Sequence, residues 1–315
     1  MKEKFHKSQL LPKDTLRRLM SRRDRPAIFR FGITFSLWLL SGAWVVESWG
    51  GPWWAIIVSH FIFGLFCMSM FAALHEAGHG TAFKSKQLNR LVATIAGIAH
   101  LYPSSIFREL HFTHHRYTHI PGKDPEISIG DQAAPTILTN PPIYVAFLTG
   151  IPYLLLKINL ILLGTVGCPE PIRKKFTAYI RPKMRAQIAI ECFFTSLIYG
   201  SIILLAIYVH AGFWGIFTGQ IVGHGLLSMY LVFEHNGLPH EGTILERTRS
   251  IQTNQLVNFL LWNMPYHAEH HAYPAVPFHA LPALHEEIKT ELTHQGRGLA
   301  NLHGDTLRKQ LGFKK

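Results

Sequence analysis

The sequence predicts an all-α integral membrane protein, with four transmembrane helices in two hairpins and a helical cytosolic cap that holds a histidine-rich metal site. Three observations lead to this fold class. Four apolar runs, at 31–48, 53–74, 187–209 and 213–233, approach the ~20 residues that a helix needs to cross a bilayer. Lysine and arginine are concentrated between and outside these runs, and histidine recurs in three short clusters.

The bulk composition fits a membrane protein with a polar cap. The chain has 315 residues, of which 48% are hydrophobic, and its mean hydropathy is +0.14. Its net charge is +12, and the basic residues lie beside the apolar runs, where they would meet anionic lipid headgroups. The sequence has no nucleic-acid-binding motif and no interleaved basic and aromatic strip, so nucleic acid is not an expected partner.

Three parts of the chain can be distinguished by composition. Residues 1–30 form a basic cytosolic tail without signal-peptide features, in which Pro26 would limit any helix. Residues 31–290 form the membrane domain with its cap, and residues 291–315 form a basic C-terminal tail. The three cysteines include no CxxC pair, which predicts free thiols.

Both predicted hairpins have short turns. Gly-Gly-Pro at 50–52 separates the first two runs, and Trp49, Trp53 and Trp54 lie where an aromatic belt is expected. His-Ala-Gly at 210–212 separates the last two runs. The helix that starts near 53 should continue past the membrane, because the first histidine cluster extends it.

Two further apolar segments are not expected to cross the bilayer as single straight helices. The segment 91–101 is too short and should lie along the interface or cover the metal site. The region 142–166 is interrupted by Pro152 and carries Lys157, so it is expected to be re-entrant or interfacial.

The distribution of basic residues predicts the orientation. The turns at 49–52 and 210–212 contain no lysine or arginine, whereas both tails and the segments 82–123 and 173–185 are basic. The positive-inside rule therefore places both termini and every histidine cluster on the cytoplasmic side. Four crossings satisfy this orientation.

The histidine clusters have the spacing of metal ligands. An HxxxH occurs at 75–79, and an HxxHH occurs at both 111–115 and 267–271, so the imidazoles of each cluster share one face of a helix. Eight imidazoles can hold two metal ions, and imidazole suits iron, zinc and copper. The eight candidate ligands are His75, His79, His111, His114, His115, His267, His270 and His271. His235, just beyond the last apolar run, is the candidate ninth ligand.

Other polar residues near the clusters have less defined roles. A metal-bound imidazole usually donates its second N–H to an acceptor, and the candidate acceptors are Glu76, Glu109, Asp124 and Glu269. His119 is either a ligand or a neighbour of one. His224, inside the last apolar run, should make a helix–helix hydrogen bond or line a cavity.

At these residues the chain resembles the membrane fatty acid desaturase superfamily, over about residues 55–290. The matching motifs are HEAGHG at 75–80, HFTHHRYTHIPGKDPE at 111–126, EHNG at 234–237 and NMPYHAEHHAYPAVPFHALPALH at 263–285. The resemblance implies a nonhaem di-iron centre, with the eight cluster histidines as iron ligands and His235 carried over at a position that varies within the superfamily. It also implies that the protein uses O2 and two electrons from a ferredoxin- or cytochrome-type donor.

The expected function is O2-dependent desaturation of a long acyl chain, in a fatty acid or an acyl lipid. The same superfamily includes fatty acid decarboxylases that form 1-alkenes, hydroxylases, and carotenoid ketolases and hydroxylases, and the motifs leave these siblings open. The sequence has no dinucleotide-binding fingerprint, no P-loop and no iron–sulfur cysteine run, so electrons should come from a separate protein.

Two alternative functional interpretations assign the protein to other classes, a zinc protease and a metal carrier. Residues 75–79 also fit HExxH, the zinc protease pattern, with Glu76 as general base. That reading leaves both HxxHH clusters unexplained and lacks a downstream aspartate motif. A histidine-rich metal carrier would place its ligands within the spans near the midplane, whereas these clusters lie outside them.

Overall fold

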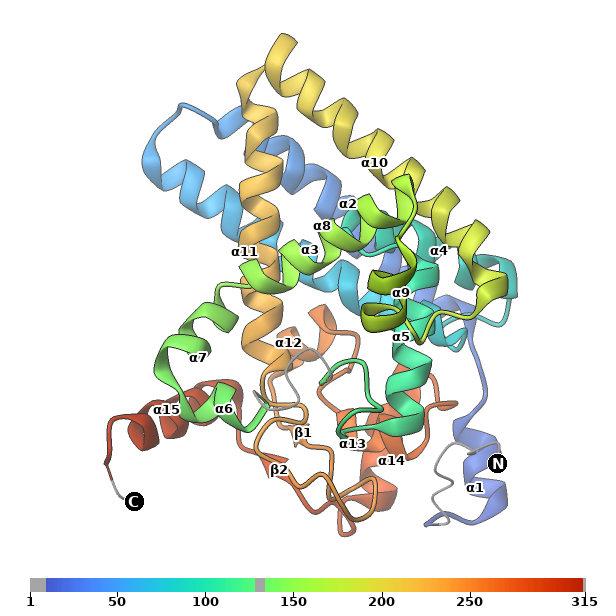
Figure 1. Ribbon diagram of the computed structural model, residues 1–315. Helices are drawn as coiled ribbons and strands as arrows, with labels where there is room; N and C mark the ends of the chain where they lie inside the picture. Colours follow the sequence, from blue (N-terminus) through green and yellow to red (C-terminus); the bar gives the residue numbers. More distant parts are fainter. Residues whose placement is uncertain (1–9, 128–133, 314–315) are drawn as a thin grey trace.

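The computed structural model describes residues 10–127 and 134–313, so the first nine residues of the predicted tail and the last two of the chain lie outside the described part. Helices dominate the described residues, and the long ones lie at one end of the molecule, above a cap of short helices and loops (Figure 1). The long helices are α2 (Asp24–Ser48), α3 (Trp53–His79), α10 (Arg185–Tyr208) and α11 (Trp214–Leu231).

The first hairpin is formed by α2 and α3, as predicted. Gly50 adopts a φ of +78° in the connecting turn, a conformation that glycine tolerates best. α3 runs without a break into the first histidine cluster and ends at Gly80, which is left-handed. α2 begins at Asp24, earlier than the apolar run at 31, because Pro26 falls in its first turn, where a missing N–H costs no helical hydrogen bond.

The second hairpin, α10 and α11, packs against the first through small residues. A Cβ on Gly64 of α3 would lie 2.7 Å from the side chain of Val222, and one on Gly223 of α11 would lie 2.5 Å from the Cys67 Cβ. Only glycine permits this approach of the two backbones, which is the packing mode of membrane helices. The contact holds α11 against the helix that carries the first histidine cluster.

Three helices of the described chain are long and apolar enough to cross a membrane by themselves: Asp24–Ser48, Trp53–His79 and Pro182–Tyr208. α11 has 18 residues, includes the polar Gln220 and His224, and is not among these three. α7 (Pro141–Leu148) and α8 (Ile151–Val166) form a pair bent by 58°, which agrees with the prediction that this region is not a plain span. The four-crossing arrangement stays a prediction.

The cap is built mainly from short helices. α4 (Lys86–Ala99) lies against α3, and α5 (Ser104–Tyr117) and α13 (His267–Ala272) carry the two HxxHH clusters. One short parallel sheet, β1 (Ser250–Ile251) with β2 (Gln295–Gly296), was not expected from the sequence. The remaining elements are α1 (Lys13–Leu19), α6 (Ala134–Thr139), α9 (Glu170–Phe176), η1 (Pro182–Met184), η2 (Ala211–Phe213), α12 (Gln255–Leu260), η3 (Phe278–Ala280), α14 (Leu281–Ile288) and α15 (Leu299–Gln310).

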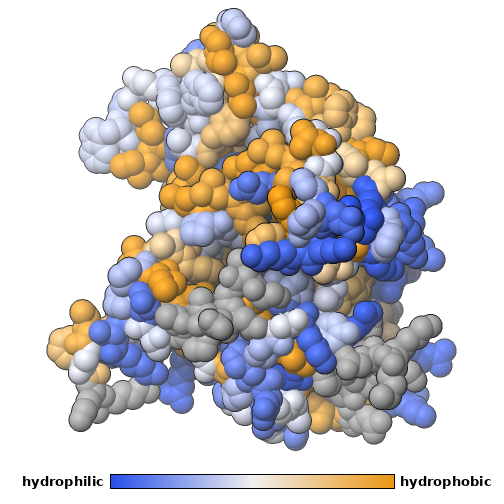
Figure 2. Space-filling view, in the orientation of Figure 1, coloured by the Kyte–Doolittle hydropathy of each residue, from blue (hydrophilic) through white to orange (hydrophobic). Residues whose placement is uncertain are grey.

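The surface agrees with this division. In Figure 2 hydrophobic residues dominate the part of the molecule formed by the long helices, and hydrophilic residues gather beside α9 and over the cap. α10 turns large apolar side chains outward, including Leu197 and Tyr208, which are 53% and 80% exposed. Such exposure suits a lipid environment and not water.

Candidate metal centre

Four elements bring the histidines together where the long helices meet the cap. His75 and His79 occupy the last turn of α3, because the helix continues past its apolar run. α5 and α13 supply the HxxHH clusters, and His235 follows the end of α11. All nine predicted ligands lie in this one region, and eight of them are buried, with His79 partly exposed.

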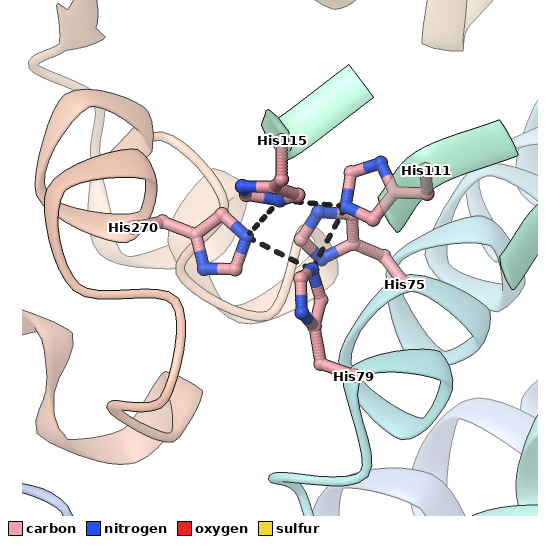
Figure 3. Close-up of side chains that lie close together, drawn as sticks. All are labelled: His75, His79, His111, His115 and His270. Atoms are coloured by element: carbon pink, nitrogen blue, oxygen red, sulfur yellow. Dashed lines mark hydrogen bonds between the residues drawn. The ribbon is translucent and has the colours of Figure 1, made fainter. Parts of the chain in front are cut away.

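Five imidazoles converge on one point, and we call this group the five-histidine site. Their ligand nitrogens all lie within 4.8 Å of one another. Figure 3 shows that they come from three helices and point toward one another. The members are His75, His79, His111, His115 and His270.

Four of these rings form a closed cycle of short nitrogen contacts. The Nε2 of His111 lies 2.8 Å from that of His79 and 3.0 Å from that of His115. The Nε2 of His270 lies 3.1 Å from each of the same two nitrogens. An Nε2 atom carries either one proton or one lone pair, so these four atoms can form at most two hydrogen bonds among their four contacts.

The lengths of these contacts match ligands around one cation. Metal–imidazole bonds are about 2.1 Å long, so adjacent ligands of an octahedral ion lie about 3.0 Å apart. The four observed contacts range from 2.8 to 3.1 Å. The five-histidine site therefore fits a transition metal ion and is poorly explained as a hydrogen-bond network.

The remaining four histidines form a second group, the four-histidine site. The ligand nitrogens of His114, His235 and His271 lie within 4.8 Å of one another. The Nε2 of His114 and of His271 are 3.3 Å apart, and the Nε2 of His267 lies 2.8 Å from that of His235. The nine predicted ligands thus divide into groups of five and four, which suits two metal ions.

Acceptors on the outer side of the rings orient their nitrogens inward. The Nδ1 of His75 donates to Glu76 at 3.0 Å and that of His114 donates to Asp124 at 2.8 Å. His235 donates in the same way to the Arg247 carbonyl at 2.9 Å. Because Nδ1 is used, Nε2 is the nitrogen available to a metal.

The predicted carboxylate acceptors are correct at two positions and wrong at two. Glu109 instead binds Arg181, which follows it by 72 residues, and Glu269 accepts from Ser250 and His285, neither of which belongs to the two histidine groups. Both residues lie within or near a cluster, but these hydrogen-bond partners are not candidate ligands.

Sequence reasoning missed two other carboxylates. Glu234 lies 3.1 Å from the Nδ1 of His267, and Glu126 lies 3.6 Å from the Nδ1 of His111. A local signal existed for each, since Glu234 directly precedes His235 and Glu126 follows Asp124 by two positions.

Burial keeps most of the cap imidazoles neutral. It lowers the pKa of His115 and His271 well below 6.5, and neighbouring imidazoles lower it further, so their lone pairs are available at neutral pH. His114 differs: burial lowers its pKa, but Asp124 and Glu126 outweigh that effect and raise it to about 9. A metal ion at its Nε2 would have to displace that proton.

Other histidines lie outside the two groups. His119 donates from Nδ1 to the Pro239 carbonyl and stands beside the four-histidine site as a neighbour. His224 forms a helix–helix contact with Lys157, as predicted. All three cysteines are free thiols, as predicted.

A profile of the fatty acid desaturase family matches residues 51–300 of this chain. The chain belongs to the fatty acid desaturase family. The matched residues include both histidine sites, and desaturases are oxidoreductases. The family match therefore argues against the zinc protease and metal carrier interpretations. The HExxH segment, residues 75–79 of α3, forms the five-histidine site together with histidines from α5 and α13.

Curated relatives share this family at low identity. A sphingolipid delta(4)-desaturase of Xenopus tropicalis is 28% identical over 78% of this chain and 64% of the relative. An sn-1 oleoyl-lipid 12-desaturase of a Picosynechococcus strain is 23% identical over 80% of this chain and 75% of the relative. A Caenorhabditis elegans relative, provisionally named a sphingolipid delta(4)-desaturase/C4-monooxygenase, is 26% identical over 79% of this chain but only 61% of its own length.

Proposed function

We propose that this desaturase-family protein is an O2-dependent desaturase of long acyl chains, with two iron ions held by its nine clustered histidines. The observation that carries the proposal is the cycle of four Nε2 contacts of 2.8 to 3.1 Å within the five-histidine site. Two iron ions, when bound, supply the activation of O2 that oxidation of an unactivated methylene requires.

The protein's own residues prepare the site for metal. Glu76 and Asp124 hold Nδ1 protons on two ligand rings and thereby aim Nε2 at the metal positions. Phe107 stacks on His111 with ring centroids 4.9 Å apart and lies edge-on to Phe71 of α3. These buried rings pack against the five-histidine site and help to exclude water from it.

An acyl chain is the substrate that this location favours. The site lies where the apolar helices meet the cap, and the exposed apolar side chains of those helices suit contact with the acyl chains of a bilayer. The named activities of the relatives, which act on sphingolipids and on an oleoyl lipid, support the same class. The packed helices would hold the chain at a fixed depth, which selects one methylene for attack.

We further propose that a separate ferredoxin- or cytochrome-type protein delivers the electrons, at the cytoplasmic side. The sequence lacks a flavin- or nicotinamide-binding fingerprint and an iron–sulfur cysteine run. The positive-inside rule supports a cytoplasmic location for both termini and for the nine histidines.

A lipid profile of a host that expresses the protein tests this function. We expect new internal double bonds with the wild-type chain and none with His270→Ala, which removes a member of the five-histidine site. His294→Ala, which alters a histidine outside both groups, serves as the matched control and should retain activity. Membrane fractions must contain equal amounts of all three proteins.

The same profile separates desaturation from its nearest alternative. The C4-monooxygenase activity in the name of the nematode relative makes hydroxylation the second candidate. New hydroxy lipids, a terminal alkene or a ketocarotenoid, with acyl unsaturation unchanged, would assign the protein to that sibling activity instead.

A further inference from the structure

A lysine is buried among the membrane helices without a counter-ion. Lys157 of α8 is 0% exposed, and its Nζ lies 3.2 Å from the Nε2 of His224 on α11. Within residues 10–127 and 134–313, no carboxylate forms an ion pair with it. A buried ammonium that lacks an anion is costly, and ionisable groups at this depth usually serve a function.

Aromatic rings surround the ammonium group. Its Nζ lies 4.1 Å from the ring centroid of Tyr153, 4.9 Å from that of Tyr102 and 5.5 Å from that of Phe71. Ring faces attract cations, so this box offsets part of the cost of burying the charged amine. The rings supply no hydrogen-bond acceptor of the strength of a carboxylate.

Two stacked histidines complete the cluster and leave it short of acceptors. His224 donates from Nδ1 to the Gln220 carbonyl, so its Nε2 accepts one proton of the ammonium group. His100 stacks on His224 with ring centroids 4.3 Å apart and an interplanar angle of 7°. Both ring nitrogens of His100 are fully buried and make no well-formed hydrogen bond, although the Cys67 carbonyl lies near.

The hydrogen-bond donors of the cluster indicate which chemical class of ligand it would bind. The Lys157 ammonium has three N–H groups and uses one of them on His224, and His100 has one N–H in its neutral form. The cluster therefore keeps two ammonium N–H groups and the weakly bonded N–H of His100, and no carboxylate of the described residues forms an ion pair with Lys157. A ligand with two acceptor oxygens and a negative charge can accept from these groups.

The cluster lies one layer of aromatic rings from the metal centre. Phe71 precedes His75 by one turn of α3, and its ring packs edge-on against Phe107 at 5.8 Å. Phe107 in turn stacks on His111 of the five-histidine site. A ligand bound at Lys157 would therefore lie close beneath the site where the proposed chemistry occurs.

We propose that Lys157, His100 and His224 bind the carboxylate of a free fatty acid, so that the substrate is a non-esterified acyl chain anchored beside the metal centre. This inference rests on the proposed function, because it names the substrate class of the same site. A carboxylate fits better than a phosphodiester, since a phosphodiester carries two substituents and the surrounding rings enclose the cluster.

A binding assay without turnover tests the inference. The full-length, iron-loaded protein is placed in nanodiscs of phosphatidylcholine, and radiolabelled palmitate is displaced by palmitate, methyl palmitate or phosphatidate. Palmitate should displace at least tenfold more strongly than the other two. Lys157→Met should weaken palmitate binding about 10- to 100-fold, the effect of losing a charge-assisted hydrogen bond, and leave methyl palmitate unchanged.

A matched lysine and a second variant complete the design. Lys86→Met removes an exposed lysine at the start of α4 and should leave every affinity unchanged. His100→Phe keeps the stack on His224 while it removes the unpaired nitrogens, and it should weaken palmitate binding several-fold. This variant decides the question if Lys157→Met does not insert into membranes.

Three results would overturn the inference. They are methyl palmitate bound as tightly as palmitate, phosphatidate bound as tightly as palmitate, and palmitate affinity unchanged in the variants of Lys157 and His100. Because the assay reads binding alone, a wild-type protein that binds palmitate but lacks iron or activity would contradict the proposed function and not the carboxylate site.

Discussion

Replacing Asp124 with asparagine should weaken metal binding at the four-histidine site while leaving the five-histidine site unaffected. The Asp124 carboxylate is fully buried, and one oxygen accepts from the His114 Nδ1 at 2.8 Å and from the His119 backbone N–H at 2.7 Å. Its other oxygen accepts from the Glu126 backbone N–H at 2.9 Å. An amide has one acceptor oxygen, so in either orientation its NH2 group faces a buried donor.

The expected loss follows from these bonds. A hydrogen bond to a charged group contributes about 1.5 to 3 kcal/mol, and each 1.4 kcal/mol is about a factor of ten in affinity. Asp124→Asn should therefore weaken iron binding at the four-histidine site about 10- to 100-fold, the usual range for an outer acceptor of a ligand histidine. In a chelator titration followed by metal analysis, iron should fall from two per chain to one before the wild-type protein loses any.

Glu109→Gln is the matched control for that experiment. Glu109 also lies beside the second cluster, but its carboxylate binds Arg181 and no ligand histidine. This variant should keep both irons at the same chelator concentration. The reasoning is refuted if Asp124→Asn retains two irons like the wild type, or if both variants lose iron equally.

Three further predictions concern topology, packing and metal. In a background without native cysteines, Trp53→Cys and Val209→Cys, at positions 73% and 70% exposed, should react with an impermeant maleimide only from outside, and Lys86→Cys only from the cytoplasm. The reverse pattern would contradict the predicted orientation, and labelling of all three positions from one side would exclude the four-crossing arrangement. Gly150→Ala should destabilise the protein by about 2 to 4 kcal/mol in unfolding experiments, because Gly150 has a φ of +69° and a Cβ would come within 2.2 Å of the α11 backbone. Gly200→Ala, with open space around its Cα, should cause no loss. Removing metal by chelation should lower the melting temperature, since a ligand at 1,000 times its Kd stabilises the folded state by about 4 kcal/mol; unchanged melting would contradict a bound metal.

The sequence predicts the hairpins and the clustering of the candidate ligand histidines because their signals are local. The Gly-Gly-Pro at 50–52 fixes the first turn, and the HxxHH spacing places three rings on one helical face wherever the helix packs. His235 could be predicted from its position just after an apolar run. The start of α2 was harder to predict from the sequence, because a proline such as Pro26 can lie in the first turn of a helix as well as end one.

The outer contacts of the site depend on tertiary packing. Glu109 pairs with Arg181 across 72 residues, and Lys157 meets His224 across 67, distances over which no spacing rule applies. The division of the histidines into groups of five and four has the same origin, since the neighbours His114 and His115 of one helix face different groups. The sequence therefore identifies the candidate ligands, and tertiary packing determines which of the two groups each one joins.

Metal counting after anaerobic loading with 57Fe tests the central claim most directly. Elemental analysis should give two irons per chain, and Mössbauer spectra should show two nitrogen-rich iron environments in the wild type. His270→Ala should lose the signal of the five-histidine site first. One zinc per chain, or a single iron that survives in His270→Ala, would contradict the assignment of the nine histidines to a di-iron centre.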